Sequence, residues 1–148
     1  MGKEIERKYL VHEAYWGALE KPEGMDIRQG YLNRTPENTV RIRIKKGVGY
    51  LTIKGKEDSG VRPEFEYLIP FNEAVEMLDL FCDRVLHKTR FEILHKGHLW
   101  EVDEFHSPNK GLVLAEIELT NPAESFELPE WVSKEVTGLP EYYNANML

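Results

Sequence analysis

The chain opens with Met1-Gly2-Lys3-Glu4-Ile5-Glu6-Arg7-Lys8, and this stretch decides the fold. Glu4, Glu6 and Lys8 stand at alternate positions, and Ile5 separates the two acids. Successive side chains of a β-strand point to opposite faces, so a strand here puts two carboxylates and an ammonium group on one face. We therefore predict a strand over residues 3–11 with one strongly charged side.

The same alternation of charged residues returns at least five more times along the chain. Mostly apolar or aromatic residues lie between the charges, and each charged pair carries a single sign. The segments are Arg41-Ile42-Arg43, Thr52-Ile53-Lys54-Gly55-Lys56 with its pair Lys54 and Lys56, Glu64-Phe65-Glu66, Lys88-Thr89-Arg90, Glu101-Val102-Asp103 and Glu116-Ile117-Glu118.

An antiparallel sheet with one solvated face explains any single pair, because such sheets alternate apolar and polar side chains and pair opposite charges across strands. It explains the whole set less well, since the signs sort by segment and the polar face is nearly all ionisable. If the sheet curls with the charges inside, they line a wet lumen. Acids there could hold a divalent cation through oxygen ligands, and Arg and Lys could hold a polyanion. Together they favour metal-assisted chemistry on phosphates.

Composition limits the class of protein. The 148 residues predict one domain covering 1–148, and a content of 41% hydrophobic and 30% charged residues is typical of a globular protein. No apolar run approaches the roughly 20 residues that span a bilayer, and the N-terminus does not match a secretory signal. A net charge of −7 argues against nucleic acid as a partner. The lone Cys82 excludes an intramolecular disulfide and indicates a reducing cytoplasm.

The order of elements predicts an α+β fold built on an antiparallel barrel. Strands do not alternate with long helices, which disfavours a parallel sheet. Eight strands can close around one small ligand and leave no free edge. We predict strands at about 3–11, 26–32, 39–46, 49–55, 62–69, 85–94, 98–105 and 112–119. A few short helices should flank the barrel: one over 72–82 capped by Asn72, a helical turn or loop at 12–19, and pieces at about 122–127 and 130–137.

Glu4-Ile5-Glu6-Arg7-Lys8 resembles the N-terminal Glu-x-Glu-x-Lys signature of the CYTH, or triphosphate tunnel metalloenzyme, family. The later charged motifs come in the family's order over nearly the whole chain. The resemblance implies an eight-stranded antiparallel β-barrel that forms a tunnel and acts on triphosphates with a divalent metal. Two further stretches, Arg28-Gln29-Gly30-Tyr31-Leu32 and Tyr143-Asn144-x-x-Met147-Leu148, resemble the compact bacterial branch, whose expected substrate is short-chain inorganic polyphosphate.

The resemblance also implies roles by position. Ligands of Mg²⁺ or Mn²⁺ would be Glu4, Glu6, Asp103, Glu116 and Glu118. The triphosphate would lie among Lys8, Arg41, Arg43, Lys54, Lys88 and Arg90. Further tunnel-lining acids would be Glu64, Glu66 and Glu101, and the catalytic residues Glu6, Lys8 and Tyr31.

Tyr31 corresponds to a tyrosine that is a proposed proton acceptor in relatives, and an amphipathic barrel tyrosine is the alternative. Bacterial relatives often carry a lysine where this chain has Tyr143, so the role of that lysine in closing the tunnel is not carried over.

The expected reaction is hydrolysis of inorganic triphosphate to phosphate and diphosphate. Hydrolysis of a nucleoside or thiamine triphosphate is the alternative, and would need an aromatic shelf that Trp16, Trp100 and Trp131 cannot be assigned to from sequence. Class IV adenylyl cyclase and a non-catalytic polyphosphate- or nucleotide-binding module are less favoured. The expected partner is a small-molecule triphosphate, without nucleic acid or membrane, and a homodimer is left open.

Overall fold

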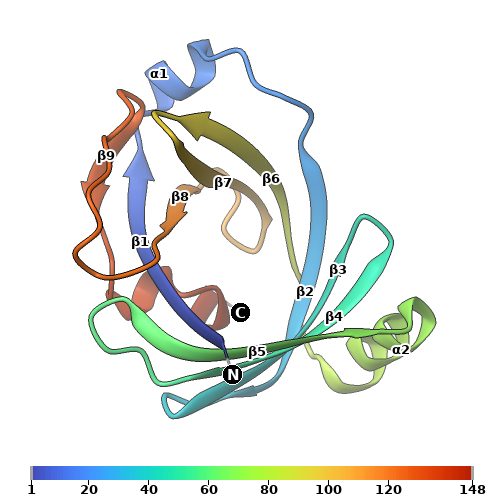
Figure 1. Cartoon of the computed structure of the whole chain (residues 1–148). Coiled ribbons are helices and arrows are strands. Elements are labelled where there is room, and N and C mark those ends of the chain that lie inside the picture. Colours follow the sequence, from blue (N-terminus) through green and yellow to red (C-terminus); the bar gives the residue numbers. More distant parts are fainter. Residues whose placement is uncertain (1, 148) are drawn as a thin grey trace.

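Eight antiparallel strands close into a barrel in the computed structural model, which describes residues 2–147 (Figure 1). Around the barrel the order is β5-β4-β3-β2-β6-β7-β8-β1, and a ninth strand pairs with the end of β1, beyond the residues of β1 that pair with β5. The strands are β1 (Gly2–Val11), β2 (Met25–Arg34), β3 (Asn38–Lys45), β4 (Val48–Gly55), β5 (Val61–Ile69), β6 (Leu86–His95), β7 (His98–Ser107), β8 (Val113–Glu118) and β9 (Val132–Glu135). The predicted eight-stranded barrel is confirmed.

The barrel closes where β1 pairs with β5. Glu4 lies opposite Arg62 in this pairing, and the backbone N–H of Glu6 donates to the carbonyl of Gly60 at 2.9 Å. Gly60 has a φ of 82°, and a Cβ added there would lie 2.6 Å from the Glu6 carbonyl oxygen. Glycine alone tolerates both the positive φ and this close approach. Closure gives both strands a partner on each side, which removes two sheet edges.

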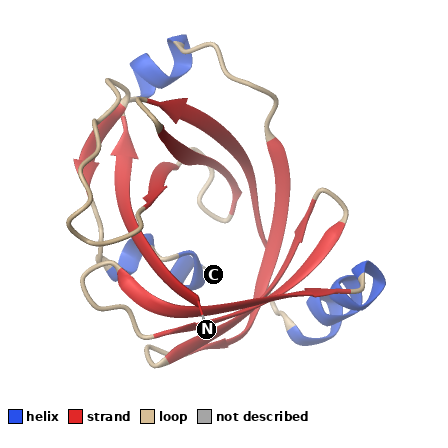
Figure 2. Ribbon diagram, viewed as in Figure 1, coloured by secondary structure: helices blue, strands red, loops and turns tan. Residues whose placement is uncertain are grey.

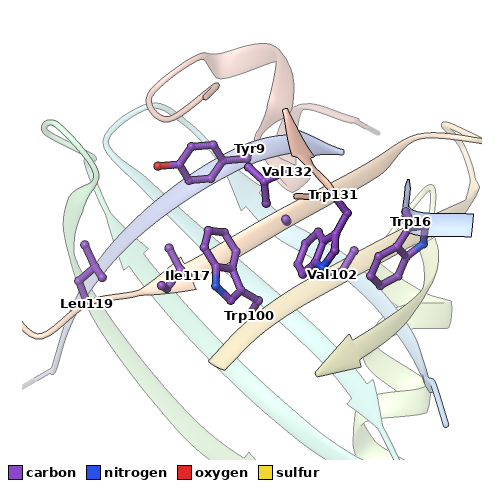
Figure 3. Close-up of a cluster of buried hydrophobic side chains, with 9 residues drawn as sticks. Tyr9, Trp16, Trp100, Val102, Ile117, Leu119, Trp131 and Val132 are labelled. Atoms are coloured by element: carbon purple, nitrogen blue, oxygen red, sulfur yellow. The ribbon is translucent and has the colours of Figure 1, made fainter. Parts of the chain in front are cut away.

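The main apolar core lies on the outer wall of the barrel, because the inner face of the same strands carries the charges. On β1, Lys8 faces inward and Tyr9 outward. Trp16, on helix α1 (Glu13–Ala18), and Trp131, next to β9, cover this wall with ring centroids 5.3 Å apart (Figure 3). The cluster comprises Tyr9, Trp16, Trp100, Val102, Ala115, Ile117, Leu119, Trp131 and Val132. Each large side chain buried there contributes about 1.5–3 kcal/mol.

Helix α2 (Phe71–Phe81) covers another part of the outer wall, over β2, β3 and β4 (Figures 1 and 2). Its Ala74 and Leu78 pack against Ile42. A Cβ on Gly30 of β2 would lie 2.7 Å from the Cys82 sulfur, so glycine permits this close packing. Cys82 is partly buried in this cluster, as a small packing residue.

A second apolar cluster fills one end of the barrel. Leu10, Leu86 and Leu114 lie two residues from Lys8, Lys88 and Glu116, on the same strand faces as those charges. The C-terminal segment adds to this end through the 3₁₀ helices η1 (Pro140–Tyr142) and η2 (Asn144–Met147). Met147 packs against Leu86, and Figure 1 shows the end of the chain within the ring of strands. The lumen is therefore polar along part of its length and closed by apolar side chains beyond it.

Two sequence predictions about helices were wrong. Residues 122–127 form a turn and an irregular segment, and residues 130–137 contain strand β9 instead of a helix. Docking on the edge of β1, with Val132 opposite Val11, outweighs the local preference of this short segment. Helix α2 was predicted well, but its N-cap is Pro70 and not Asn72. Within residues 2–147, no helix has the length and apolar character needed to cross a membrane.

Candidate active site

A cavity of about 490 Å³ lies inside the barrel, and all eight barrel strands contribute side chains to it. Among the described residues its wall carries ten cations and eight acids, although the whole chain has a net charge of −7. An excess of positive charge in a confined space favours an anionic ligand. The cations are Lys8, Arg34, Arg41, Arg43, Lys45, Lys54, Lys56, Arg62, Lys88 and Arg90, and the acids are Glu4, Glu6, Glu57, Glu64, Glu66, Glu101, Glu116 and Glu118.

The barrel order separates these charges into two halves. Strands β7, β8, β1 and β5 are neighbours and carry every acid of the predicted motifs; we call them the acidic half. Strands β4, β3, β2 and β6 are also neighbours and carry Lys54, Arg41, Arg43, Lys88 and Arg90; we call them the cationic half. Lys8 and Arg62 are the cations among the acids.

Cations reach most carboxylates of the acidic half. Lys54 contacts Glu4 at 2.8 Å, and Arg62 contacts the same carboxylate at 3.2 Å. Lys8 lies opposite Glu116 across β1 and β8, and their charged groups are 3.3 Å apart. Burial raises the pKa of Glu4, but Lys54 and Arg62 outweigh it and hold that pKa well below the usual value. Glu4 is therefore an anion with two cationic partners.

Glu6 is a poorly compensated acid of this half, as is Glu64, whose pKa burial and Glu4 raise to about 7. Burial, followed by the charges of Glu116 and Glu4, raises the pKa of Glu6 well above its usual value. Burial raises the pKa of Glu116 too, but Lys8 and Arg90 outweigh it and lower that pKa. Partial burial of the Glu118 carboxyl group, followed by the charge of Glu4, raises the pKa of Glu118. These carboxylates repel one another, and a divalent cation would relieve the repulsion.

The donor set fits a hard metal ion. Glu4, Glu6, Glu116 and Glu118 offer carboxylate oxygens, which Mg²⁺ and Mn²⁺ prefer. No group of three or more His, Cys, Asp or Glu side chains within residues 2–147 is arranged around a common point suited to a metal. The oxygens of Glu4 and Glu116 instead contact Lys54, Arg62 and Lys8. Binding of a metal ion would require these contacts to rearrange.

In the cationic half, Asp103 of neighbouring β7 fixes two of the cations. Its two oxygens accept from Nε and Nη2 of Arg90 at 2.8 and 2.9 Å, and Lys88 donates to one of them at 2.7 Å. Burial raises the pKa of Asp103, but Arg90 and Lys88 outweigh it and hold the pKa at about 2. Asp103 does not line the cavity. In this geometry Asp103 supports Arg90 and Lys88, and its role as a metal ligand stays a prediction.

Lys88 is fully buried and has cations for neighbours. Burial, together with the charges of Arg90 and Arg43, lowers the pKa of Lys88 to about 7 despite its contact with Asp103. Its ammonium group also donates to the side-chain oxygen of Asn144, at 2.9 Å, in the C-terminal segment. A negative ligand nearby would stabilise the charged form.

Arg41 and Arg43 have mainly neutral partners. Arg43 donates from Nε to the Gln29 amide oxygen at 2.9 Å, and Arg41 donates to the Thr52 hydroxyl at 3.1 Å. The nearest carboxylate of Arg41 is that of Glu66, at 3.6 Å, and its own Nε is buried without a partner. Burial, followed by Arg41 and Arg90, lowers the pKa of Arg43 to about 9, so it is still charged at neutral pH. These guanidinium groups keep spare positive charge for an anion.

Every predicted site residue except Asp103 lines the cavity. Sequence reasoning missed Arg62, Gln29 and Asn144. Arg62 precedes Glu64 by two residues on the same face of β5, so the alternation used elsewhere could have found it. Gln29 precedes Tyr31 by two in the same way. Asn144 carries no local signal, because a distant segment brings it to Lys88.

Tyr31 and Tyr143 are the aromatic side chains among the described lining residues. Tyr143 donates to Glu57 at 2.8 Å, and its ring lies within 6 Å of the cationic groups of Lys8 and Arg62. The three tryptophans belong to the outer cluster instead (Figure 3). They offer no shelf at the cavity for an organic group.

The sequence profile of the CYTH domain matches residues 2–144. The chain belongs to the CYTH family. It is 44% identical over 149 residues to the inorganic triphosphatase of Acetivibrio thermocellus, covering 100% of this chain and 94% of that protein. It is also similar to the crystal structure of an inorganic triphosphatase, with 30% identity, a TM-score of 0.66, and coverage of 97% of this chain and 95% of the other.

The same fold occurs in a protein from Pyrococcus furiosus, at 20% identity and a TM-score of 0.61, over 81% of this chain and 80% of that one. At this identity the likeness concerns the fold alone. Membership of the family of triphosphate tunnel metalloenzymes confirms the resemblance predicted from the charged motifs, and it implies a divalent metal ion at the site.

Proposed function

We propose that this CYTH protein hydrolyses inorganic triphosphate to phosphate and diphosphate in the barrel cavity. The observation that carries the proposal is the separation of the lumen into a half with closely spaced carboxylates and a half with incompletely compensated cations. A triphosphate and a metal ion supply the two charges that these halves lack. The two inorganic triphosphatases to which the chain is similar support this choice of substrate.

The substrate would lie against the cationic half. Arg41 and Arg43 would take phosphate oxygens with their spare N–H groups, since guanidinium groups bind phosphate in a bidentate manner. Lys88 and Arg90, held by Asp103, would extend this surface along β6. Lys8 of the acidic half and Lys54 of the cationic half would contact the remaining oxygens.

The metal would lie at the acidic half, held by Glu4, Glu6, Glu116 and Glu118 as Mg²⁺ or Mn²⁺. When bound, such an ion neutralises phosphate oxygens and lowers the pKa of a water ligand. We assign Asp103 to positioning of Arg90 and Lys88, because both of its oxygens already accept hydrogen bonds from them.

Glu6 is our choice for the group that orients the attacking water. Its raised pKa follows from burial and from Glu116 and Glu4, so it accepts a proton more readily than either of those two acids, whose pKa values are lowered. The water oxygen would bond to the terminal phosphorus while the bond to the diphosphate oxygen breaks, and the water proton would pass to Glu6. Lys8 would offset charge that develops on the diphosphate. The barrier is then lowered mainly by positioning and electrostatics.

Hydrolysis of a nucleoside or thiamine triphosphate is not favoured. An organic group would need an aromatic surface at the cavity, and the tryptophans lie on the opposite side of the barrel wall. Tyr143 already contacts Lys8, Arg62 and Glu57. Three further expectations stay predictions: one domain over 1–148, the choice between monomer and homodimer, and a cytoplasmic location.

The test is phosphate release from tripolyphosphate, ATP and thiamine triphosphate, each with Mg²⁺, Mn²⁺ and a chelator. We expect fast release from tripolyphosphate with metal and none with chelator. A preference for ATP or thiamine triphosphate would move the substrate assignment. Tight binding of all three without phosphate release would indicate a non-catalytic binding module instead of an enzyme.

A further inference from the structure

Gln29 lies at the centre of a buried chain of hydrogen bonds inside the barrel. Its side chain is 0% exposed. The amide oxygen accepts from Nε of Arg43 at 2.9 Å, and the amide nitrogen donates to the Tyr31 hydroxyl at 3.0 Å. The same nitrogen lies 3.4 Å from the side-chain oxygen of Asn144. Gln29 thus joins a cation, a cavity-lining hydroxyl and the C-terminal segment.

The orientation of this amide follows from chemistry. A guanidinium group has donors and no acceptor, so the amide oxygen of Gln29 must face Arg43. The amide nitrogen must then face Tyr31 and Asn144, where both neighbours present oxygen atoms. The Tyr31 oxygen is therefore an acceptor toward Gln29. The hydroxyl proton of Tyr31 points elsewhere, and Tyr31 lines the cavity.

The neutral partner of Arg43 distinguishes it from Arg90 and Lys54, which face carboxylates. Arg90 on β6 faces the carboxylate of Asp103, and Lys54 on β4 faces that of Glu64. Arg43 on β3 faces Gln29 on β2. Two residues along the same strands, Arg41 faces Tyr31. A carboxylate at position 29 would hold Arg43 equally well but would cancel its charge. An amide fixes the guanidinium group and leaves its charge for an anion.

We propose that Gln29 is a positioning residue that leaves the Arg43 charge uncompensated and turns the Tyr31 hydroxyl into a hydrogen-bond donor to a phosphate oxygen. Tyr31 then acts by donating a hydrogen bond to the substrate, in place of the proton acceptance that the family resemblance implied. This inference rests on the proposed triphosphatase activity. It adds a residue that determines the free charge of Arg43 on β3 and the hydrogen-bond direction of Tyr31 on β2.

The test compares four proteins: wild type, Gln29→Glu, Tyr31→Phe and the double variant. Glutamate has the shape of glutamine and still accepts from Arg43, but it cannot donate to Tyr31. The Tyr31 hydroxyl would donate to the new carboxylate and be lost to the substrate. We expect kcat to fall about tenfold or more in each single variant, the cost of one hydrogen bond to a charged group. In the Tyr31→Phe background, Gln29→Glu should lower kcat much less.

Binding supplies a readout that does not depend on turnover. Calorimetry with tripolyphosphate in chelator should show a Kd at least about tenfold weaker for Gln29→Glu, because the new carboxylate cancels the Arg43 charge. Asn72→Asp is the matched control, since it makes the same change of amide to carboxylate at an exposed position of helix α2, on the outer wall of the barrel. It should alter neither kcat nor Kd by more than about twofold.

If Gln29→Glu does not fold, Gln29→Met removes both hydrogen bonds without adding charge. It should lower kcat less in the Tyr31→Phe background than alone. Equal losses of kcat in both backgrounds, or wild-type kcat in the position 29 variants, would overturn the inference while the triphosphatase proposal stands. Absence of phosphate release from wild type would instead remove the proposed function. The affinity for tripolyphosphate, measured in the presence of chelator, would still test the role of Gln29.

Discussion

The two halves of the lumen are built from strands with the same alternation of charged and apolar side chains, but their charged groups are paired to different extents. In the acidic half, the Glu4 carboxylate has Lys54 and Arg62 within 3.2 Å. In the cationic half, Arg43 has an amide as its partner, and one nitrogen of Arg41 is buried without any. Like charges crowd in both halves, at Glu6 among acids and at Arg43 among cations.

The difference shows where ligands are expected. A buried charge costs free energy unless it is paired, so a fold that leaves guanidinium groups incompletely paired needs an anion to complete them. The raised pKa of Glu6 shows the opposite need, for a cation or a proton, in the acidic half. Two ligands of opposite charge, each suited to one half, would bring the lumen closer to balance.

The largest expected effect concerns the acidic half. Glu6→Gln keeps the shape of the side chain and removes its charge, so we expect kcat for tripolyphosphate to fall about 100-fold or more. Binding of tripolyphosphate in chelator should stay within about threefold of wild type, because the cationic half is intact. Glu135→Gln, on the outer wall, is the control and should keep full activity. Full activity of Glu6→Gln would refute the metal and water assignments together.

Ligand-induced stabilisation tests whether the halves act separately. At a concentration 100 times Kd, a ligand stabilises the fold by about 2.7 kcal/mol, which raises Tm by about 5–10 °C for a chain of this size. Mg²⁺ alone and tripolyphosphate with chelator should each raise Tm in thermal melts. Glu116→Gln should reduce only the metal effect. Constant melting temperatures with both ligands would count against a binding cavity.

In the cationic half, we expect Arg43→Ala to weaken the free energy of tripolyphosphate binding by about 2 kcal/mol. Tripolyphosphate should bind about 30-fold more weakly by calorimetry in chelator, because a phosphate oxygen loses a charged partner. The affinity for metal in the absence of tripolyphosphate should not weaken. Arg28→Ala serves as control, since Arg28 is 60% exposed on the outer wall. Unchanged substrate affinity in Arg43→Ala would place the anion elsewhere in the cavity.

The smallest effect is a dependence of substrate affinity on pH. Burial and the neighbouring cations lower the pKa of Lys88 to about 7, so its charged form is complete below that pH in the free protein. A bound anion favours the charged form and raises its pKa. Affinity for tripolyphosphate should therefore fall as pH rises above 7, by about tenfold between pH 6 and 8.

Lys88→Met separates this contribution from the titration of tripolyphosphate itself, which both proteins share. The ratio of the two Kd values should change across pH 7. A ratio that is constant from pH 6 to 8 would show that Lys88 keeps its charge without the anion.

Much of the site could be predicted because its pattern is local. The alternation in Glu4-Ile5-Glu6 or Arg41-Ile42-Arg43 states which side chains share a face, and this held for every predicted residue that lines the cavity. The same local rule was not extended to Arg62 and Gln29, which continue the inward faces of β5 and β2. For the segment over 130–137 no local rule sufficed, because pairing with β1 made it a strand.

The sequence by itself determined the strands, their charged faces and the kind of ligand that such faces attract. Only the tertiary structure decided that β1 pairs with β5, that four acidic strands become neighbours, and that Asp103 lies behind Lys88 and Arg90. It also decided that Asn144 reaches Lys88, which lies 56 residues earlier in the sequence. The reason is physical: side-chain alternation follows from backbone geometry within one strand, whereas neighbours around a barrel depend on long-range pairing and on the packing of the whole chain.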